Sequence, residues 1–171
     1  MKEDCYINEL MDILKREIQS FNTVSELLIL EEKSLIEFNT RELAENLEKQ
    51  EDVFSSIACL EKSRMQVLTK ISELSGEDPE TLTIKQLASM VDEPLKKKLL
   101  ETGHVLNAIH EDIKKKKTTN TMLIRQGILL VESDIRTILN ALGNHGERNT
   151  GYTKRAKQNP LSGGVYIDGR M

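Results

Sequence analysis

The sequence has few of the residues that make turns, sheets and large compact cores. Of its 171 residues only 4% are aromatic, none is tryptophan, and there are three prolines and nine glycines. So few turn-forming residues argue against an all-β fold, which needs a turn between each pair of short strands. Charged residues make up 30% of the chain. This composition is typical of long, exposed helices around a thin core.

The residue patterns of common catalytic and metal sites are also missing. The two cysteines, Cys5 and Cys59, are far apart and match no metal-binding spacing. His104 and His110 do not share a helix face, so they make a poor metal pair. We find no glycine-rich phosphate loop and no nucleophile elbow. We therefore expect neither enzymatic activity nor a cofactor or metal.

Three further features bear on location and partners. No apolar run is long enough to cross a bilayer, and the first ten residues, MKEDCYINEL, are acidic, unlike a signal peptide. We therefore expect a cytoplasmic protein without an integral membrane segment. The formal net charge of -4 argues against nucleic acid as the main partner.

The middle stretch, residues 39–76, reads as one long helix that is apolar on more than one face. Its seven-residue rows are Val53, Leu60, Val67 and Leu74; Leu43, Ile57 and Ile71, with Gln50 and Arg64 as gaps; and Leu47, Phe54 and Leu68. A helix with several apolar rows needs a neighbour on each of them. We therefore interpret it as the middle helix of a bundle, between two other long helices.

The first of these neighbours is predicted over residues 3–38. Its main apolar row has strict heptad spacing and consists of Ile7, Leu14, Phe21, Leu28 and Leu35, with Phe38 ending a second row. A sustained seven-residue period predicts knobs-into-holes packing at shallow crossing angles. The acidic residues on the other faces are expected to be solvated: Glu9, Asp12, Glu17, Glu26, Glu31, Glu32 and Glu37.

Local signals divide the chain into helices. Asn39 and Glu42 have the spacing of a capping box, and so short a break predicts an antiparallel hairpin. A continuous helix is the alternative, since neither glycine nor proline enforces the turn there. Gly76 suits a helix C-cap. Thr83 then caps a short connector helix over residues 83–90, and Pro94 follows the start of another helix.

The third long helix is predicted over residues 93–142, and its second half has more apolar residues than one contact requires. Leu129, Leu130 and Val131 are consecutive, so they cannot all face one neighbour. Self-association or burial against the connector would cover this surplus. The functional alternative is a helix face kept for another chain. Between the two halves, the four lysines 114–117 are interpreted as a solvated surface, with an anionic ligand or membrane surface as the alternative.

Together these patterns predict an all-α fold. We expect an elongated antiparallel bundle, or coiled coil, of three long helices with a short connector helix. This helical bundle domain spans residues 1–142. The segment 143–171 is rich in glycine, asparagine and basic residues and shows no periodicity, so we predict that it forms a flexible C-terminal tail.

LLILEEKSL at 27–35 leads through Asn39 and Thr40 into Leu43. This segment is similar to the first hairpin of the FlgN family, the flagellar export chaperones for the hook–filament junction proteins. Lys49-Gln50-Glu51 and Arg64 take the places of its Lys-Glu-type segment and its Arg. NTMLI at 120–124 matches the second of two family asparagines and the Leu-rich run, although Lys117 stands where the first would be. Tyr152 and Tyr166-Ile167-Asp168 continue the likeness.

The resemblance implies a cytoplasmic chaperone that binds the C-terminal helical region of hook-associated proteins. It would prevent their premature assembly and deliver them to the flagellar type III export gate. By resemblance Asn120 belongs to a family motif and Tyr152 docks at the export gate. The end of the third helix would bind the cargo, and there we assign cargo binding to Leu123, Ile124, Leu130, Val131, Ile135, Ile138, Leu139 and Leu142.

Two interpretations from other classes stay open. A structural coiled-coil protein would use the surplus face to close a homodimer, so a homo-oligomer in the absence of cargo is one expectation. A histidine phosphotransfer-like helical domain would carry an exposed histidine. That family expects a Lys and a Gly soon after the histidine, and His104-Val105-Leu106-Asn107 lacks them.

Overall fold

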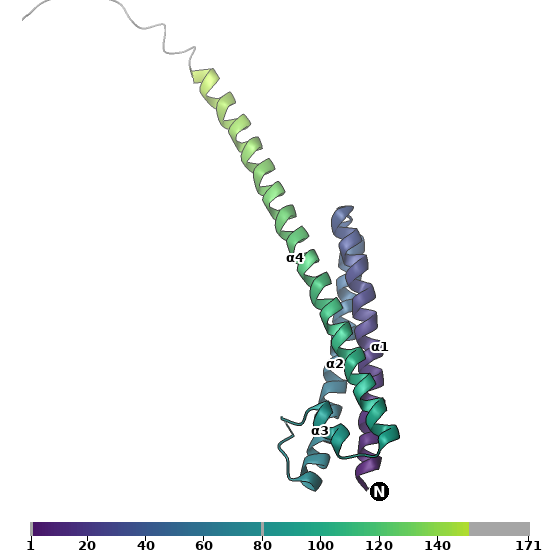
Figure 1. Ribbon diagram of the computed structural model, residues 1–171. Helices are drawn as coiled ribbons and strands as arrows, with labels where there is room; N and C mark the ends of the chain where they lie inside the picture. Colours follow the sequence, from purple (N-terminus) through teal and green to yellow (C-terminus); the bar gives the residue numbers. More distant parts are fainter. Residues whose placement is uncertain (1, 80, 151–171) are drawn as a thin grey trace, which may run out of the picture. The chain divides into compact units, whose positions relative to one another are not determined.

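The computed structural model describes residues 2–79 and 81–150, and over these residues the chain is helical with no strand (Figure 1). The helices are α1 (Lys2–Ile36), α2 (Thr40–Ser75), α3 (Ile84–Ser89) and α4 (Glu93–Thr150). The predicted all-α class with three long helices and a short connector is confirmed. The chain divides into two units, Met1–Gln126 and Gly127–Met171. Helix α4 runs past the predicted end at Leu142, so the first residues assigned to the tail are helical.

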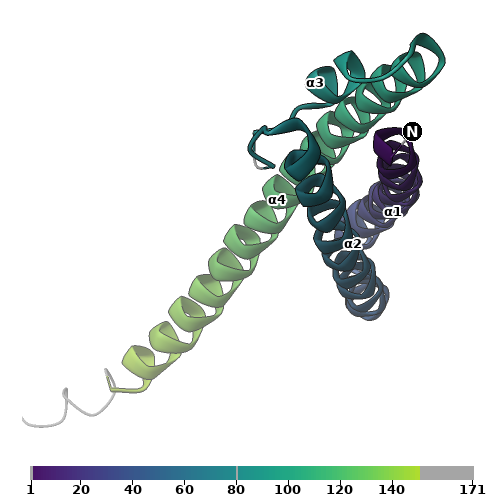
Figure 2. The ribbon, with the colours of Figure 1, turned by 90° about the horizontal axis from the view of Figure 1, so that it is seen from below.

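Helices α1 and α2 form the predicted antiparallel hairpin, in which they lie side by side (Figures 1 and 2). The Asn39 side chain accepts a hydrogen bond from the Glu42 amide at 3.2 Å, as an N-cap does. The Asn39 amide donates to the Ser34 carbonyl, in place of the reciprocal bond from Glu42 that a capping box would give. Phe38 adopts φ 53° in the turn and is exposed, so its assignment to an apolar row was wrong.

The connector is held by local caps and by a close approach to α4. Gly76 ends α2 at φ 75°, a conformation that favours glycine. Thr83 and Gln86 form a complete capping box at the start of α3. Two carbons of Ile84 lie 3.2 Å from the position that a Cβ at Gly103 would occupy. Glycine at this position therefore lets α3 pack directly against α4.

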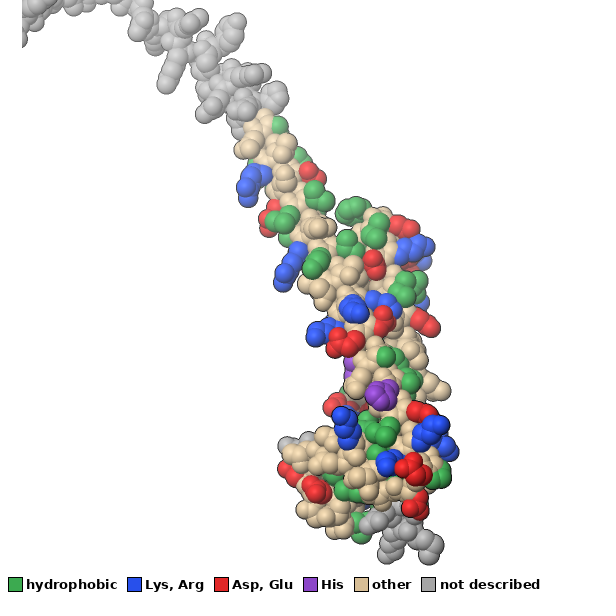
Figure 3. Space-filling view, viewed as in Figure 1, with side chains coloured by type: hydrophobic (Ala, Val, Ile, Leu, Met, Phe, Trp, Pro, Cys, Tyr) green, Lys and Arg blue, Asp and Glu red, His purple; other side chains and the backbone are tan. Residues whose placement is uncertain are grey.

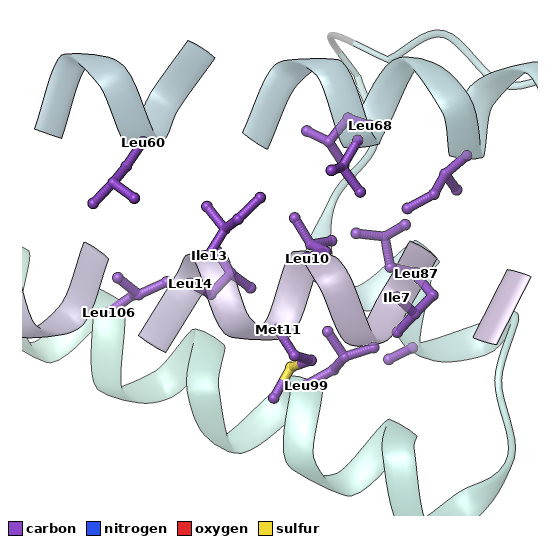
Figure 4. Packing of buried hydrophobic residues seen from close by; sticks show 13 residues of the cluster. Ile7, Leu10, Met11, Ile13, Leu14, Leu60, Leu68, Leu87, Leu99 and Leu106 are labelled. Carbon is purple, nitrogen blue, oxygen red and sulfur yellow. The ribbon is translucent and has the colours of Figure 1, made fainter. Parts of the chain in front are cut away.

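All four helices contribute to the buried core of the first unit (Figure 4). The side chain of Leu99 on α4 is 0% exposed, beside Met11 of α1. Leu87 of α3 is buried in the same cluster. The largest buried side chains in it include Ile7, Leu10, Leu14, Leu60, Leu68, Leu87, Leu99 and Leu106. Most residues in the predicted rows of α1 and of the second half of α2 are therefore buried or packed against the core, but Leu74, predicted in the first row of α2, is exposed.

Near the turn of the hairpin the contact between α1 and α2 is polar, contrary to the sequence prediction. Leu47 and Phe54 of the predicted third row are exposed, whereas Gln50, interpreted as a gap, is buried. The Gln50 amide donates to Asn46 at 2.7 Å and to Glu31 at 2.8 Å. Burial of these groups is tolerated because they bond one another.

Two acidic residues expected to be solvated are also buried. Glu31 accepts the bond from Gln50, and Glu17 forms an ion pair with Arg64 at 3.0 Å. Both carboxylates lie on the α1 faces that the other helices cover. Sequence periodicity missed them because it assigns charged residues to the surface, whereas a paired carboxylate can occupy a seam between helices.

Candidate protein-binding surface

One face of α4 carries a regular row of large apolar side chains. We call it the α4 stripe, and its residues follow one another in alternating steps of four and three: Ile124, Ile128, Val131, Ile135, Ile138 and Leu142. This spacing keeps all six on one side of a helix. Each is between 41% and 64% exposed, so the stripe is open to another chain. Figure 3 shows hydrophobic side chains on the surface of α4.

Most of the predicted cargo-binding residues are exposed on α4. Leu139 is 62% exposed and flanks the stripe, four residues after Ile135. Leu130 is 58% exposed on another face of the helix, and Leu123 is half-buried. The prediction omitted Ile128, which is 54% exposed. The four-and-three spacing that places it between Ile124 and Val131 was the available signal. Leu129 faces away from the stripe, as expected for consecutive residues.

The stripe begins where the buried face of α4 ends, at Asn120. This side chain is 2% exposed and donates to the Leu28 carbonyl of α1 at 2.9 Å. Its Oδ1 has no hydrogen-bond partner among the described atoms. A buried acceptor without a partner costs free energy, so Asn120 makes the end of the α1–α4 contact weaker than an apolar residue would. Asn120 is also the residue for which the sequence resemblance predicts a place in a family motif.

The lysine run is only partly a solvated surface. Lys114, Lys115 and Lys117 are exposed, as predicted. Lys116 instead donates to Asp112 and to Ser25 of α1. Ser25 also donates to Asp112 at 2.7 Å. The hydrogen bond from Lys116 is the main cause that lowers the pKa of the Asp112 carboxyl, followed by the bond from Ser25.

The remaining candidate residues do not assemble into a chemical site in the described part of the chain. His104 is exposed, and His110 packs edge-to-face on Phe21 with ring centroids 4.6 Å apart. Across the described residues, no His, Cys, Asp or Glu side chains cluster in a way that could hold a metal ion. Tyr152 lies outside the described residues, as does the rest of the predicted tail beyond Thr150.

A helical bundle with an exposed apolar row on one long helix defines a protein-binding module of the helix-packing type. The model of the family described as FlgN protein matches residues 1–160. The chain therefore belongs to the FlgN family, whose members are chaperones of flagellar type III export. Comparison with curated proteins and with solved structures found no match. No helix in the described part of the chain is long and apolar enough to span a membrane.

Proposed function

We propose that this chain is a cytoplasmic export chaperone for hook-associated flagellar proteins. It holds their C-terminal helical region on α4, prevents premature assembly and delivers them to the export gate. The observation that carries the proposal is the exposure of the α4 stripe, all six of whose side chains are open in the free protein. Membership of the FlgN family supplies the class of partner.

The energetics favour a helical partner. Burying one large apolar side chain contributes roughly 1.5–3 kcal/mol, so six of them can offset the cost of ordering and orienting a partner. The stripe has heptad spacing, which suits an apolar row on another helix. Isoleucine or valine occupies five of its six positions. In parallel coiled coils, β-branched residues at both core positions favour more than two strands, so we expect the cargo to supply more than one helix.

The test is capture of a purified C-terminal helical fragment of a hook-associated protein. We expect Ile135→Ser/Leu139→Ser to abolish capture while far-UV circular dichroism stays unchanged. The matched control is Met122→Ser/Leu129→Ser, which removes two exposed apolar side chains from the opposite face of α4. Equal capture by both double variants would contradict the assignment of the stripe.

Delivery is a separate step, which we assign to Tyr152. We expect Tyr152→Ala to leave capture of the cargo fragment unchanged and to slow secretion of hook-associated proteins into the medium. Tyr152→Phe tests whether the ring or the hydroxyl matters. A loss of cargo capture in Tyr152→Ala would instead make Tyr152 part of the cargo site.

The heptad spacing of the stripe also favours a second candidate, a homodimer that closes the stripe on itself. Sedimentation of the chain without cargo distinguishes the two. A monomer that binds a hydrophobic dye, and loses the dye when the cargo fragment is added, supports the chaperone. A tight dimer that keeps its partner in the presence of the fragment supports the structural protein.

A further inference from the structure

A second unfilled surface lies entirely within the first unit, between α2 and α4. A cavity of about 330 Å³ opens there over α1. Its apolar lining includes Leu14 and Phe21 from α1, Ile57 and Leu68 from α2, and Leu106 from α4, with His110 beside them. Leu82, Ile84 and Leu87 of the connector region also line the cavity. Three helices therefore surround a space that none of them fills.

The same space continues along the bundle. A second cavity, of about 140 Å³, is lined by Leu28 of α1, Phe54 of α2 and Lys117 of α4. Leu28 follows Phe21, and Lys117 follows His110, by seven residues each, which is a rise of about 10 Å along a helix. A shallow depression along α4 shares His110 with the first cavity and Lys117 with the second. We therefore treat the three hollows as parts of one depression, which we call the α2–α4 groove.

The two walls of the groove differ in charge. On the α2 wall, Arg64 is already paired with Glu17 and with Glu61. The α4 wall presents Lys114, Lys117 and Arg125 along a shallow depression that contains no acidic residue. Within the described part of the chain, neither Lys114 nor Lys117 has an ion-pair partner. An unpaired basic wall attracts acidic groups on whatever lies in the groove.

We propose that the α2–α4 groove binds an amphipathic helix of a partner protein, with an apolar row facing α1 and acidic residues along the edge that faces α4. The half-exposed Phe54 and Ile124, and the half-buried Ile57 and Ile113, supply apolar contacts on both walls. Bound there, the partner completes a four-helix bundle around α1. This site is separate from the α4 stripe, and it does not depend on which protein the stripe holds.

The apolar walls decide between classes of partner. A lipid headgroup or a nucleic acid would use the lysines but would leave Phe54, Ile57 and Ile113 exposed to water. A helix with one acidic edge satisfies both the walls and the charge. We therefore expect the lysines to determine which edge of the partner helix faces α4, and the apolar residues to provide most of the binding affinity.

The probe is a three-heptad helical peptide with leucine at the core positions, glutamate along one edge and glutamine along the other. The control peptide has glutamine on both edges. Binding to the full chain is followed by fluorescence anisotropy. We expect the acidic peptide to bind more tightly, and Lys114→Glu/Lys117→Glu to weaken it about tenfold. Lys115→Glu is the matched control, because Lys115 is exposed on the same helix but does not line the groove.

Three outcomes would overturn the proposal. Equal weakening by Lys115→Glu would show a general charge effect. Equal binding of the two peptides would remove the role of the α4 wall. Loss of the preference in Ile135→Ser/Leu139→Ser, which changes only the α4 stripe region, would place the peptide there. None of these three peptide-binding measurements depends on cargo capture by the α4 stripe. The groove and the proposed chaperone function are therefore tested independently of each other.

Carbodiimide crosslinking of the same mixture identifies the occupant. We expect Lys114 and Lys117 to couple to glutamates of the peptide. Coupling of either lysine to Asp168 of the same chain would assign the groove to the chain's own C-terminal residues. Coupling to a carboxylate of an isotopically distinct copy would assign it to a second copy. Both results would contradict a partner helix.

Discussion

The two halves of α4 differ in their surroundings, and the second half is the richer of the two in apolar residues. Leu99 and Leu106 in the first half are buried against α1, whereas Ile135 and Ile138 in the second half are more than half exposed. The apolar row of the second half continues every three or four positions, whereas Thr102 and Gly103 interrupt that of the first half. The difference teaches that an apolar row on a helix indicates a need for a partner, and that the first half of α4 meets this need within its own unit.

The second half can be helical without a partner because the first half has already nucleated the helix. Starting a helix is costly, whereas adding a residue to an existing helix is nearly neutral for most residue types. Helix α4 is continuous over 58 residues, through the lysine run and past Gly127. The apolar residues of the second half can therefore lie on a helix that is formed before any partner binds.

The largest expected effect tests the comparison directly. Leu99→Ala should lower the free energy of unfolding by about 2–5 kcal/mol, because the side chain is 0% exposed. Ile138→Ala should change it by less than about 0.5 kcal/mol, because that side chain is exposed. Urea denaturation of both variants gives the two values. A large loss in Ile138→Ala would mean that the stripe is covered in the free protein.

A smaller effect is expected at the boundary between the halves. Asn120→Leu removes a buried oxygen that lacks a partner and adds an apolar contact to α1. The Leu28 carbonyl that loses the side-chain bond lies inside α1, where it keeps its helical bond. We expect stability to rise by about 1 kcal/mol, measured as a higher urea midpoint. A lower midpoint would show that the bond to Leu28 outweighs the unpaired oxygen.

The smallest expected effect concerns the polar contact between Asp112, Ser25 and Lys116. The pKa of Asp112 is lowered in the folded state, so its ionised form stabilises folding above the pKa of the unfolded chain. That contribution disappears as the pH falls through the folded-state pKa. Asp112→Asn should therefore be slightly less stable than the wild type near neutral pH and equal to it in acid. Thermal melts across that pH range measure the difference, and a constant gap would contradict the linkage.

The helices and their ends were predictable because their signals are local. The break at Asn39, the caps at Gly76 and Thr83, and the start near Pro94 depend on neighbouring residues alone, and all four are confirmed. The end of α4 was not predicted. A helix that is already formed can extend through residues that have only a weak preference for helix. The loss of the apolar period at Leu142 therefore did not mark the end of α4.

The candidate site was predictable in part. The apolar surplus of the second half of α4, together with the family resemblance, selected eight residues, of which seven are exposed and Leu123 is half-buried, but it omitted Ile128. It could not find the polar seam of Glu31, Asn46 and Gln50. Each of these residues alone has the character of a surface residue. The approach of α1 and α2 lets Gln50 donate to Glu31 and Asn46 donate to the Leu27 carbonyl, and these bonds make burial tolerable.

The sequence by itself determined that this protein is a set of long helices with a surplus of apolar side chains late in the last one. That information is periodic and local, because the 3.6-residue turn converts spacing along the chain into faces of a helix. Only the tertiary structure decided which faces were covered: Leu99 is buried, Ile138 is exposed, and a groove remains between α2 and α4. Burial is a property of neighbours, and neighbours distant in the sequence are fixed by packing.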